Sequence, residues 1–407
     1  MSKVNDAMAW IDERIPLTAT WDKHVGKYYA PKNFNFWYYF GSLALLVLVI
    51  QIVTGIFLTM NYKPDGELAF RSVEYIMRDV NWGWLIRYMH STGASMFFVV
   101  VYLHMMRGIM YGSYKKPREL LWIFGMLIYL VLMAEAFMGY LLPWGQMSFW
   151  GAQVIISLFG AIPWVGDAIT LWLRGDYVVA DATLNRFFAL HVIAMPLVLI
   201  GLVFVHIVAL HEVGSNNPDG VDIKKNKGAD GIPLDGIPFH PYYTVKDLIG
   251  VAVFLLVFFA IVFFAPEMGG YFLEHANYVP ADPLKTPEHI APVWYFTPFY
   301  AILRAMPDKL LGVIAMFSAI AVLFFLPWID RNPVRSIRYR SFKYKAILTA
   351  FIIAFVVLGY FGMQPVTTAG TWISRLCSLT YFGFFVALFF ISKNEKTKPV
   401  PERVNYL

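Results

Sequence analysis

The sequence of 407 residues contains little cysteine and little charge. Its single cysteine, Cys377, excludes an internal disulfide, an iron–sulfur cluster held by cysteines alone, and covalent haem attachment through a CxxCH motif. Charged residues make up 15% of the chain and hydrophobic residues 58%, whereas soluble domains are about 25% charged. The polar start of the chain does not have the basic segment and short apolar core of a cleavable signal peptide. We therefore expect an integral membrane protein.

Eight apolar stretches of about 20 residues predict membrane-spanning helices. They lie at about residues 37–60, 86–106, 121–141, 187–210, 246–265, 309–328, 346–363 and 373–392. Lys and Arg residues are concentrated on one side: 23 lie in the N-terminal segment, in alternate loops and in the tail, against seven in the opposite loops. This imbalance predicts that both termini are cytoplasmic. Anionic lipid accounts for the net charge of +6, so nucleic-acid binding is not expected.

Four histidines lie in two of these stretches: His90 and His104 in the second, His191 and His206 in the fourth. Imidazoles are costly inside a bilayer unless they are paired or ligated. A step of fourteen residues turns an α-helix through almost four turns and rises ~21 Å, so His90 and His104 share one face at two depths. Since both stretches run in the same direction, His90 pairs with His191 and His104 with His206. The pattern predicts two stacked bis-imidazole sites for a metal or haem.

The second histidine spacing is one residue longer than the first. A step of fifteen residues, from His191 to His206, overshoots four helical turns by ~60°. Pro196 follows His191 by five residues and has no backbone N–H to donate. Pro196 can therefore anchor a local bulge that absorbs the extra residue.

Four glycines repeat the spacing of the first histidine pair. Gly41 and Gly55 in the first span, and Gly125 and Gly139 in the third, are each fourteen residues apart. Glycine destabilises a helix interior, and its usual compensation is the close approach of another helix or of a ligand. Small-residue helix packing is the alternative for any one of them. The shared period favours two flat cofactors within a four-helix bundle formed by the first four spans.

Seven longer motifs are spread over most of the chain. They are WLIRYMHSTGAS at 84–95, YLHMMRGIMYGSY at 102–114, GYLLPWGQMSFWGAQV at 139–154, RFFALH at 186–191, LHEVGSNNP at 210–218, FHPYYTVKDL at 239–248 and TPEHIAPVWYFTPFYAILR at 286–304. Together they resemble the cytochrome b family of the quinol:cytochrome c oxidoreductases, the bc1 complexes, and the proteobacterial members most. The fourteen residues between His191 and His206 match the related b6 proteins instead. Those divide this length between two polypeptides, so a single chain with eight spans favours the bc1 type.

The resemblance implies two non-covalent b haems. His90 and His191 would ligate a low-potential haem near the outer face, and His104 and His206 a high-potential haem near the inner face. Arg87 and Arg107, each three residues from one of these histidines, would meet the haem propionates. Snorkelling to the membrane interface is the alternative for both arginines.

The resemblance also implies an outer quinol-oxidation pocket, enclosed by a pair of short surface helices at about 147–180 and by the segment 286–304. Its residues would be Phe137, Met138, Tyr140, Gly151, Pro292, Trp294, Tyr295 and Tyr300. The family's Pro-Glu-Trp-Tyr motif carries Val293 here in place of the glutamate, and valine cannot accept a proton. The nearest carboxylate of the same loop belongs to Glu288. Glu288, or a water that it holds, can replace the missing group, and a solvated loop charge is the alternative for this residue.

An inner quinone site is implied near the cytoplasmic ends of the first, fourth and fifth spans. The residues at its family positions are His211, Ser215, Asn216, Lys246 and Asp247. An imidazole near a carboxylate can bind a quinone and deliver protons to it. The expected organisation is an all-α membrane protein with a dihaem bundle at 1–213, a cytoplasmic linker at 214–245 and a C-terminal domain at 246–407.

The mechanism implied by the resemblance is bifurcated quinol oxidation in the inner membrane of a bacterium. One electron would pass to a Rieske iron–sulfur protein and the other through the two haems to the inner quinone. The iron–sulfur protein and cytochrome c1 must be separate chains because this chain has one cysteine, and the family suggests a homodimeric complex surrounded by lipid. One alternative is a dihaem membrane anchor of a dehydrogenase, a class without the motif at 286–304. A transporter with proton-relaying histidines is another, and it predicts no chromophore.

Overall fold

The computed structural model of the protein describes residues 3–405 and is mostly helical. In that part of the chain, seven helical segments are long and apolar enough to cross a membrane. They are α3 (Tyr39–Thr59), α5 (Gly83–Tyr111), α6 (Glu119–Leu141), α9 and α10 together (Asp181–Val213), α11 (Thr244–Phe264), α15 (Phe342–Met363) and α16 (Thr368–Lys393). They coincide with seven of the eight predicted spans.

The remaining predicted span, 309–328, is divided into two helices. These are α13 (Lys309–Phe324) and the short α14 (Leu326–Ile329). The break has a clear cause, since Pro327 has no N–H to bond the carbonyl of Leu323 one turn earlier. The indole Nε1 of Trp122 donates to that carbonyl instead, at 2.8 Å. With 16 residues, α13 rises ~24 Å, which is less than the ~30 Å of a bilayer core.

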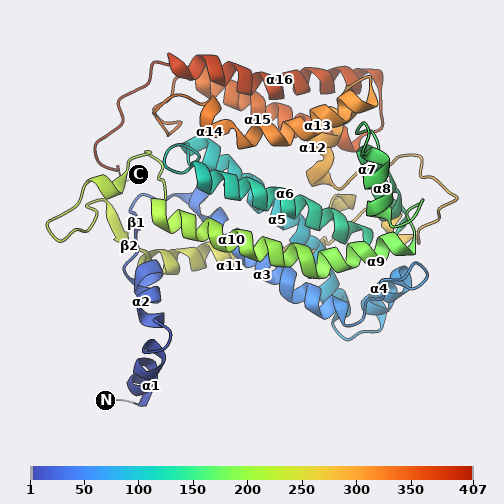
Figure 1. Ribbon diagram of the computed structural model, residues 1–407, viewed down its shortest axis with the longest axis horizontal. Helices are drawn as coiled ribbons and strands as arrows, with labels where there is room; N and C mark the ends of the chain where they lie inside the picture. Colours follow the sequence, from blue (N-terminus) through green and yellow to red (C-terminus); the bar gives the residue numbers. More distant parts are fainter. Residues whose placement is uncertain (1–2, 406–407) are drawn as a thin grey trace.

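Four helices form the bundle that carries the histidines. Helix α3 packs along α5, and α6 packs along α10 (Met195–Val213). Figure 1 shows α13, α15 and α16 as a layer along one side of this bundle, while α11 packs on α3 and α5. One continuous apolar core joins the bundle to that layer. The predicted four-helix arrangement of the first four spans is therefore present.

Short polar residues begin the helices of the C-terminal layer. The side chain of Asp308 accepts a hydrogen bond from the backbone N–H of Leu311 at 2.8 Å and so begins α13. Ser341 begins α15 and Thr367 begins α16 in the same way. Such caps satisfy N–H groups that have no partner inside the helix, which explains why these spans begin at these residues.

The shorter elements gather at the two ends of the bundle (Figure 1). One end, called here the α7–α8 end, carries α4 (Ala69–Arg78), α7 (Gln146–Phe159) and α8 (Gly166–Arg174). The terminal end carries both chain termini, α1 (Lys3–Asp12), α2 (Leu17–Trp21) and a two-stranded antiparallel sheet of β1 (Tyr29–Pro31) and β2 (Gly236–Pro238). Helix α12 (Thr297–Ala305) packs on α13 and α15. Single turns of 3₁₀- or π-helix lie at 22–26, 36–38, 190–194, 223–225, 239–243, 268–270, 275–278 and 294–296.

Two predictions about these ends can be compared with the structure. Helices α7 and α8 are the pair of short helices expected at 147–180, so that prediction is confirmed. The all-α prediction is incomplete because β1 pairs with β2. Each strand has three residues and includes a proline. Strands this short, with partners more than 200 residues apart, leave no alternating apolar pattern to detect.

The segment predicted as a cytoplasmic linker, 214–245, is held tightly at the terminal end. Buried Asp219 accepts from Arg338 and from the hydroxyl of Tyr339, each at 2.9 Å. Buried Asp235 pairs with Lys32 at 2.9 Å and with Arg403 at 2.7 Å. Burial opposes ionisation of Asp235, but the hydrogen bonds from Arg403 and Lys32 outweigh it and lower its pKa to about 2. The division into 1–213, 214–245 and 246–407 stays a prediction.

A buried ionic cluster beside this linker makes a test of stability. Asp330 and Glu395 both contact the guanidinium of Arg340, at 2.8 and 2.7 Å, and Lys115 lies 2.7 Å from Asp330. We expect Asp330→Asn to destabilise the protein by about 3–5 kcal/mol, because it leaves buried cations without their carboxylate. Thermal unfolding of the detergent-solubilised protein measures this change.

The matched control is the exposed pair of Glu74 and Arg78, 2.8 Å apart on α4. Breaking it with Glu74→Ala should cost less than about 1 kcal/mol, as usual for surface ion pairs. Equal losses in the two variants would contradict a structural role for the buried cluster.

Candidate functional site

The four histidines face one another in the two predicted pairs. The ring centroids of His90 and His191 are 6.3 Å apart, with the ring planes at 86°. Those of His104 and His206 are 6.4 Å apart, with the planes at 59°. A metal bound at about 2 Å from one nitrogen of each ring puts the two centroids roughly 6 Å apart. Both pairs therefore have the separation that a shared metal ion requires.

A π-helical turn explains how the longer spacing still produces a matching pair. Residues Leu190–Ala194 form this turn, directly before α10, and Pro196 lies in the first turn of α10. A π-turn holds one more residue than an α-helical turn. The extra residue between His191 and His206 is absorbed there, so the predicted bulge is confirmed.

Each of the four predicted glycines lies against one histidine. A β-carbon added at Gly139 would overlap Cε1 of His191. The corresponding distance to Cε1 is 3.3 Å for Gly55 against His90, 3.3 Å for Gly125 against His206 and 3.4 Å for Gly41 against His104. The prediction that the glycine gaps lie at the depths of the histidine pairs is confirmed. Larger side chains at these positions would displace the imidazoles.

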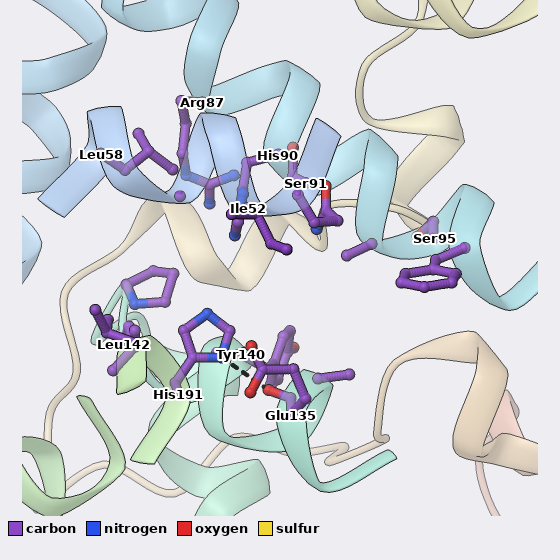
Figure 2. Close-up of a pocket in the computed structure, with 18 of the residues that line it drawn as sticks. Ile52, Leu58, Arg87, His90, Ser91, Ser95, Glu135, Tyr140, Leu142 and His191 are labelled. Carbon is purple, nitrogen blue, oxygen red and sulfur yellow. Dashed lines mark hydrogen bonds and ion pairs between the residues drawn. The ribbon is translucent and has the colours of Figure 1, made fainter. Parts of the chain in front are cut away.

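A cavity of about 280 Å³ lies beside the pair nearer the α7–α8 end. Its wall includes His90, His191 and Arg87, and most of its other residues are apolar. Figure 2 shows the two histidines on opposite sides of this space, with Glu135 against His191. The paired imidazoles, the glycine gaps and the apolar wall suit a flat, apolar cofactor with a charged edge near Arg87.

Three of the predicted quinol-pocket residues line the same cavity, namely Tyr140, Val293 and Tyr295. The indole of Trp294 donates at 3.2 Å to Ser95, which also lines it. The remaining predicted residues are not part of the cavity wall. Phe137 packs on Phe187, and Met138 is buried. Gly151 faces the ring of Tyr140, Pro292 precedes Val293, and Tyr300 donates to the carbonyl of Ile290. The structure therefore brings Tyr140, Val293 and Tyr295 together at one cavity, and the other predicted residues lie outside its wall.

Two of the carboxylates in the segment between α11 and α12, Glu274 and Glu288, differ in their surroundings. Glu288 is exposed and is not part of the cavity wall. Glu274, which the sequence did not suggest, is partly buried between Leu273 and Asn277, two wall residues. The amide of Asn277 donates to Glu274 at 3.4 Å and to the Tyr140 hydroxyl at 3.0 Å. Burial raises the pKa of Glu274 to about 7, so this carboxyl group can exchange a proton near neutral pH.

The predicted inner-site histidine contacts two aromatic rings at the terminal end. The ring of His211 stacks on Tyr28 with centroids 4.5 Å apart, and its centroid lies 5.1 Å from that of His24. The Nδ1 atoms of His24 and His211 are 2.9 Å apart, so one donates to the other. Ser215 lies 3.5 Å from the Tyr28 hydroxyl. His24 was missed because it precedes the first span by many residues, and only folding brings it to His211.

The other predicted inner-site residues make neighbouring contacts. The amide of buried Asn216 donates to the carbonyl of Tyr111 at 2.6 Å, and Lys246 donates to the carbonyl of Phe34 at 2.9 Å. Asp247 is partly buried in the first turn of α11. The structure therefore brings His211 and Ser215 to the same tyrosine, Tyr28, while these three make their contacts with other residues.

Arg107 occupies the position expected next to the second histidine pair. Its guanidinium carbon lies 4.8 Å from the centre of the Tyr38 ring, and its Nη2 lies 3.2 Å from Nδ1 of His104. Its Nε is buried without a hydrogen-bond partner in the described residues. A buried donor of this kind suits a bound anionic group.

Comparisons with known proteins agree with this geometry. The family models "Cytochrome b/b6/petB" and "Cytochrome b(C-terminal)/b6/petD" match residues 25–214 and 280–382. The chain is 61% identical over 405 residues to cytochrome b of Allochromatium vinosum, covering 98% of both, and 52% identical over 402 residues to that of Rhodospirillum rubrum, covering 98% and 96%. It is also similar to a chain of a solved hyperthermophilic respiratory complex III, with 40% identity, a TM-score of 0.88, and coverage of 95% of this chain and 99% of that one. The chain belongs to the cytochrome b family, as a membrane subunit of the quinol:cytochrome c oxidoreductase type found in proteobacteria.

Proposed function

We propose that the protein is the dihaem subunit of a respiratory bc1 complex that oxidises quinol at its outer face and reduces quinone at its inner face. The observation that carries this proposal is the two pairs of facing imidazoles, each with two glycines directly against its rings. His90 and His191 would hold one haem b, and His104 and His206 the other. When bound, these haems would pass single electrons between the two faces.

The arginines and glycines complete the two haem sites. Arg87 lines the cavity beside the outer pair and Arg107 lies beside the inner pair, so each would bind a haem propionate. Gly55 and Gly139 have no side chain that would crowd the outer pair of histidines. Gly41 and Gly125 do the same at the inner pair. The α7–α8 end would then be the outer face and the terminal end the cytoplasmic face.

The outer quinol would bind in the cavity against Tyr140, Val293 and Tyr295. Val293 cannot take a proton, and the buried carboxylate of Glu274 supports a role for this residue in its place. Because Asn277 donates to the Tyr140 hydroxyl, that hydroxyl can pass its own proton on to Glu274. The exposure of Glu288 makes it the weaker candidate.

The inner quinone would bind at His211 and Ser215, with Asn216, Lys246 and Asp247 around them. The imidazole of His211 is hydrogen-bonded to His24 and can deliver a proton to a quinone oxygen. Helices α13 and α14 would together complete an eighth span, with both termini cytoplasmic. The positive loops support this orientation in a bacterial inner membrane.

The partners follow from the chemistry that this chain cannot perform. Bifurcation sends one electron of the quinol to an iron–sulfur protein of the Rieske type and then to cytochrome c1. Both would be separate subunits, and the complex would be a homodimer within lipid. The similarity to a chain of complex III supports such an assembly.

A reduced-minus-oxidised spectrum with quantitative haem extraction tests the proposal. We expect two non-covalent b haems per chain in the purified complex. One haem or none would overturn the dihaem assignment. A complex with two haems that fails to reduce cytochrome c from quinol would favour the alternative of a dehydrogenase anchor.

A further inference from the structure

Glu135 is an acidic residue inside the membrane-spanning part of α6, and it has no role in the function proposed for the haem and quinone sites. Its Oε1 lies 3.1 Å from Nδ1 of His191, and its backbone carbonyl lies 2.9 Å from the same nitrogen. Figure 2 shows this contact, with the carboxylate at the cavity wall. Both side chains are largely buried, with exposed fractions of 16% for Glu135 and 15% for His191. A carboxylate placed there is costly unless it has a partner, so the contact calls for a functional explanation.

The direction of this hydrogen bond follows from ligation. An imidazole that binds a metal through Nε2 keeps its proton on Nδ1. Nδ1 of His191 therefore donates to the backbone carbonyl of Glu135 at 2.9 Å, and the carboxylate Oε1 lies 3.1 Å from the same nitrogen. A carboxylate behind a ligating histidine makes the imidazole more basic and a stronger electron donor to the metal. The second oxygen, Oε2, is buried with no hydrogen-bond partner among the described residues. The charge of Glu135 is therefore directed toward His191.

Two of the other histidines, His90 and His104, have partners of a different kind. The Thr54 hydroxyl donates to the carbonyl of Ile50 at 2.6 Å and lies 2.9 Å from Nδ1 of His90, so its contact with that ring is neutral. At the inner pair, the group nearest Nδ1 of His104 is the guanidinium of Arg107, at 3.2 Å. A carboxylate thus contacts a ligand of the outer pair and a cation contacts a ligand of the inner pair. In a medium of low dielectric constant such charges act strongly on a nearby centre.

We propose that Glu135 lowers the reduction potential of the haem that His90 and His191 would hold, because its carboxylate places negative charge 3.1 Å from Nδ1 of His191. This inference rests on the proposed haem ligation. A negative neighbour stabilises ferric over ferrous iron, whereas Arg107 has the opposite effect at the inner pair. Arg87 lines the outer cavity as well. Glu135 is a positioning residue, since it acts through His191.

The test is a potentiometric titration of both haems in the purified complex. In Glu135→Gln, which keeps the size and an acceptor oxygen but removes the charge, the midpoint potential of the outer haem should shift to a more positive value. The potential of the inner haem should stay unchanged and serves as the internal reference. Glu67→Gln, which removes an exposed carboxylate from the loop between α3 and α4, should move neither potential.

The other outcomes distinguish failure of the role of Glu135 from failure of the proposed dihaem function. Two bound haems with an unmoved outer potential in Glu135→Gln would overturn the role of Glu135 and leave the dihaem function intact. Loss of the outer haem in both Glu135→Gln and Glu135→Thr would show that Glu135 is needed for haem binding itself rather than for setting the potential, which also overturns the tuning role. A wild-type complex with fewer than two haems would remove the proposed function itself.

Discussion

Gly139→Val is expected to leave the protein with one haem b per chain and to abolish quinol oxidation. A β-carbon at position 139 would overlap Cε1 of His191, and the branched side chain of valine cannot turn away within a helix. The imidazole must rotate out of line with His90, and the affinity for the outer haem should fall at least about 100-fold. Haem extraction and the spectrum of the purified complex measure this loss. His191→Leu should give the same spectrum by removing the ligand directly.

Gly201→Ala is the matched control for this prediction. Gly201 lies in α10, and a β-carbon there meets nothing within 4 Å. The alanine variant should therefore keep both haems and normal turnover. Two haems with an unchanged spectrum in Gly139→Val would mean that Gly139 serves helix packing, which would contradict the cofactor gap.

Glu274→Gln is expected to slow quinol oxidation about 100- to 10,000-fold, the usual contribution of one positioned proton acceptor. The carboxylate accepts a proton only when it is ionised, and burial raises its pKa to about 7. The wild-type rate should therefore rise as the pH increases from about 6 to about 8. Glutamine does not ionise, so the variant should lose this limb of the pH profile while its haem spectrum stays normal.

Glu288→Gln provides the comparison within the same loop. Its carboxylate is exposed, so its loss should leave both the rate and the pH profile of quinol oxidation unchanged. The opposite result, a slow Glu288 variant beside a normal Glu274 variant, would restore the original expectation for Glu288 and remove Glu274 from the proposal.

The sequence was sufficient to predict which residues face each other wherever a regular helical spacing determined the geometry. The histidine and glycine spacings of fourteen residues predicted which faces would meet, and the structure places Gly55 at His90 and Gly139 at His191. The bulge after His191 could also be predicted, because proline cannot donate the backbone hydrogen bond that a regular turn needs. The span at 309–328 was predicted as continuous because its apolar composition does not reveal the break that Pro327 causes.

The residues that were missed depend on tertiary contacts. Glu288 precedes Val293 by five residues and Glu274 precedes it by nineteen, so proximity in sequence favoured Glu288. The exposure of Glu288 and the burial of Glu274 are decided by how the loop folds. His24 and His211 are 187 residues apart in the chain. Glu135 lies in a predicted span, but only the packing of α6 on the turn at 190–194 brings it to His191.

The contacts of Asp235 have a consequence for the order of events during synthesis. The carboxylate holds Lys32 from the start of the chain and Arg403 from beyond its last helix. Domains form in the order in which they leave the ribosome, and the bundle helices are complete at Val213, well before Arg403 is made. The contact between Asp235 and Arg403 is therefore among the last that the chain can form, and the terminal end stays open to rearrangement until translation reaches that arginine.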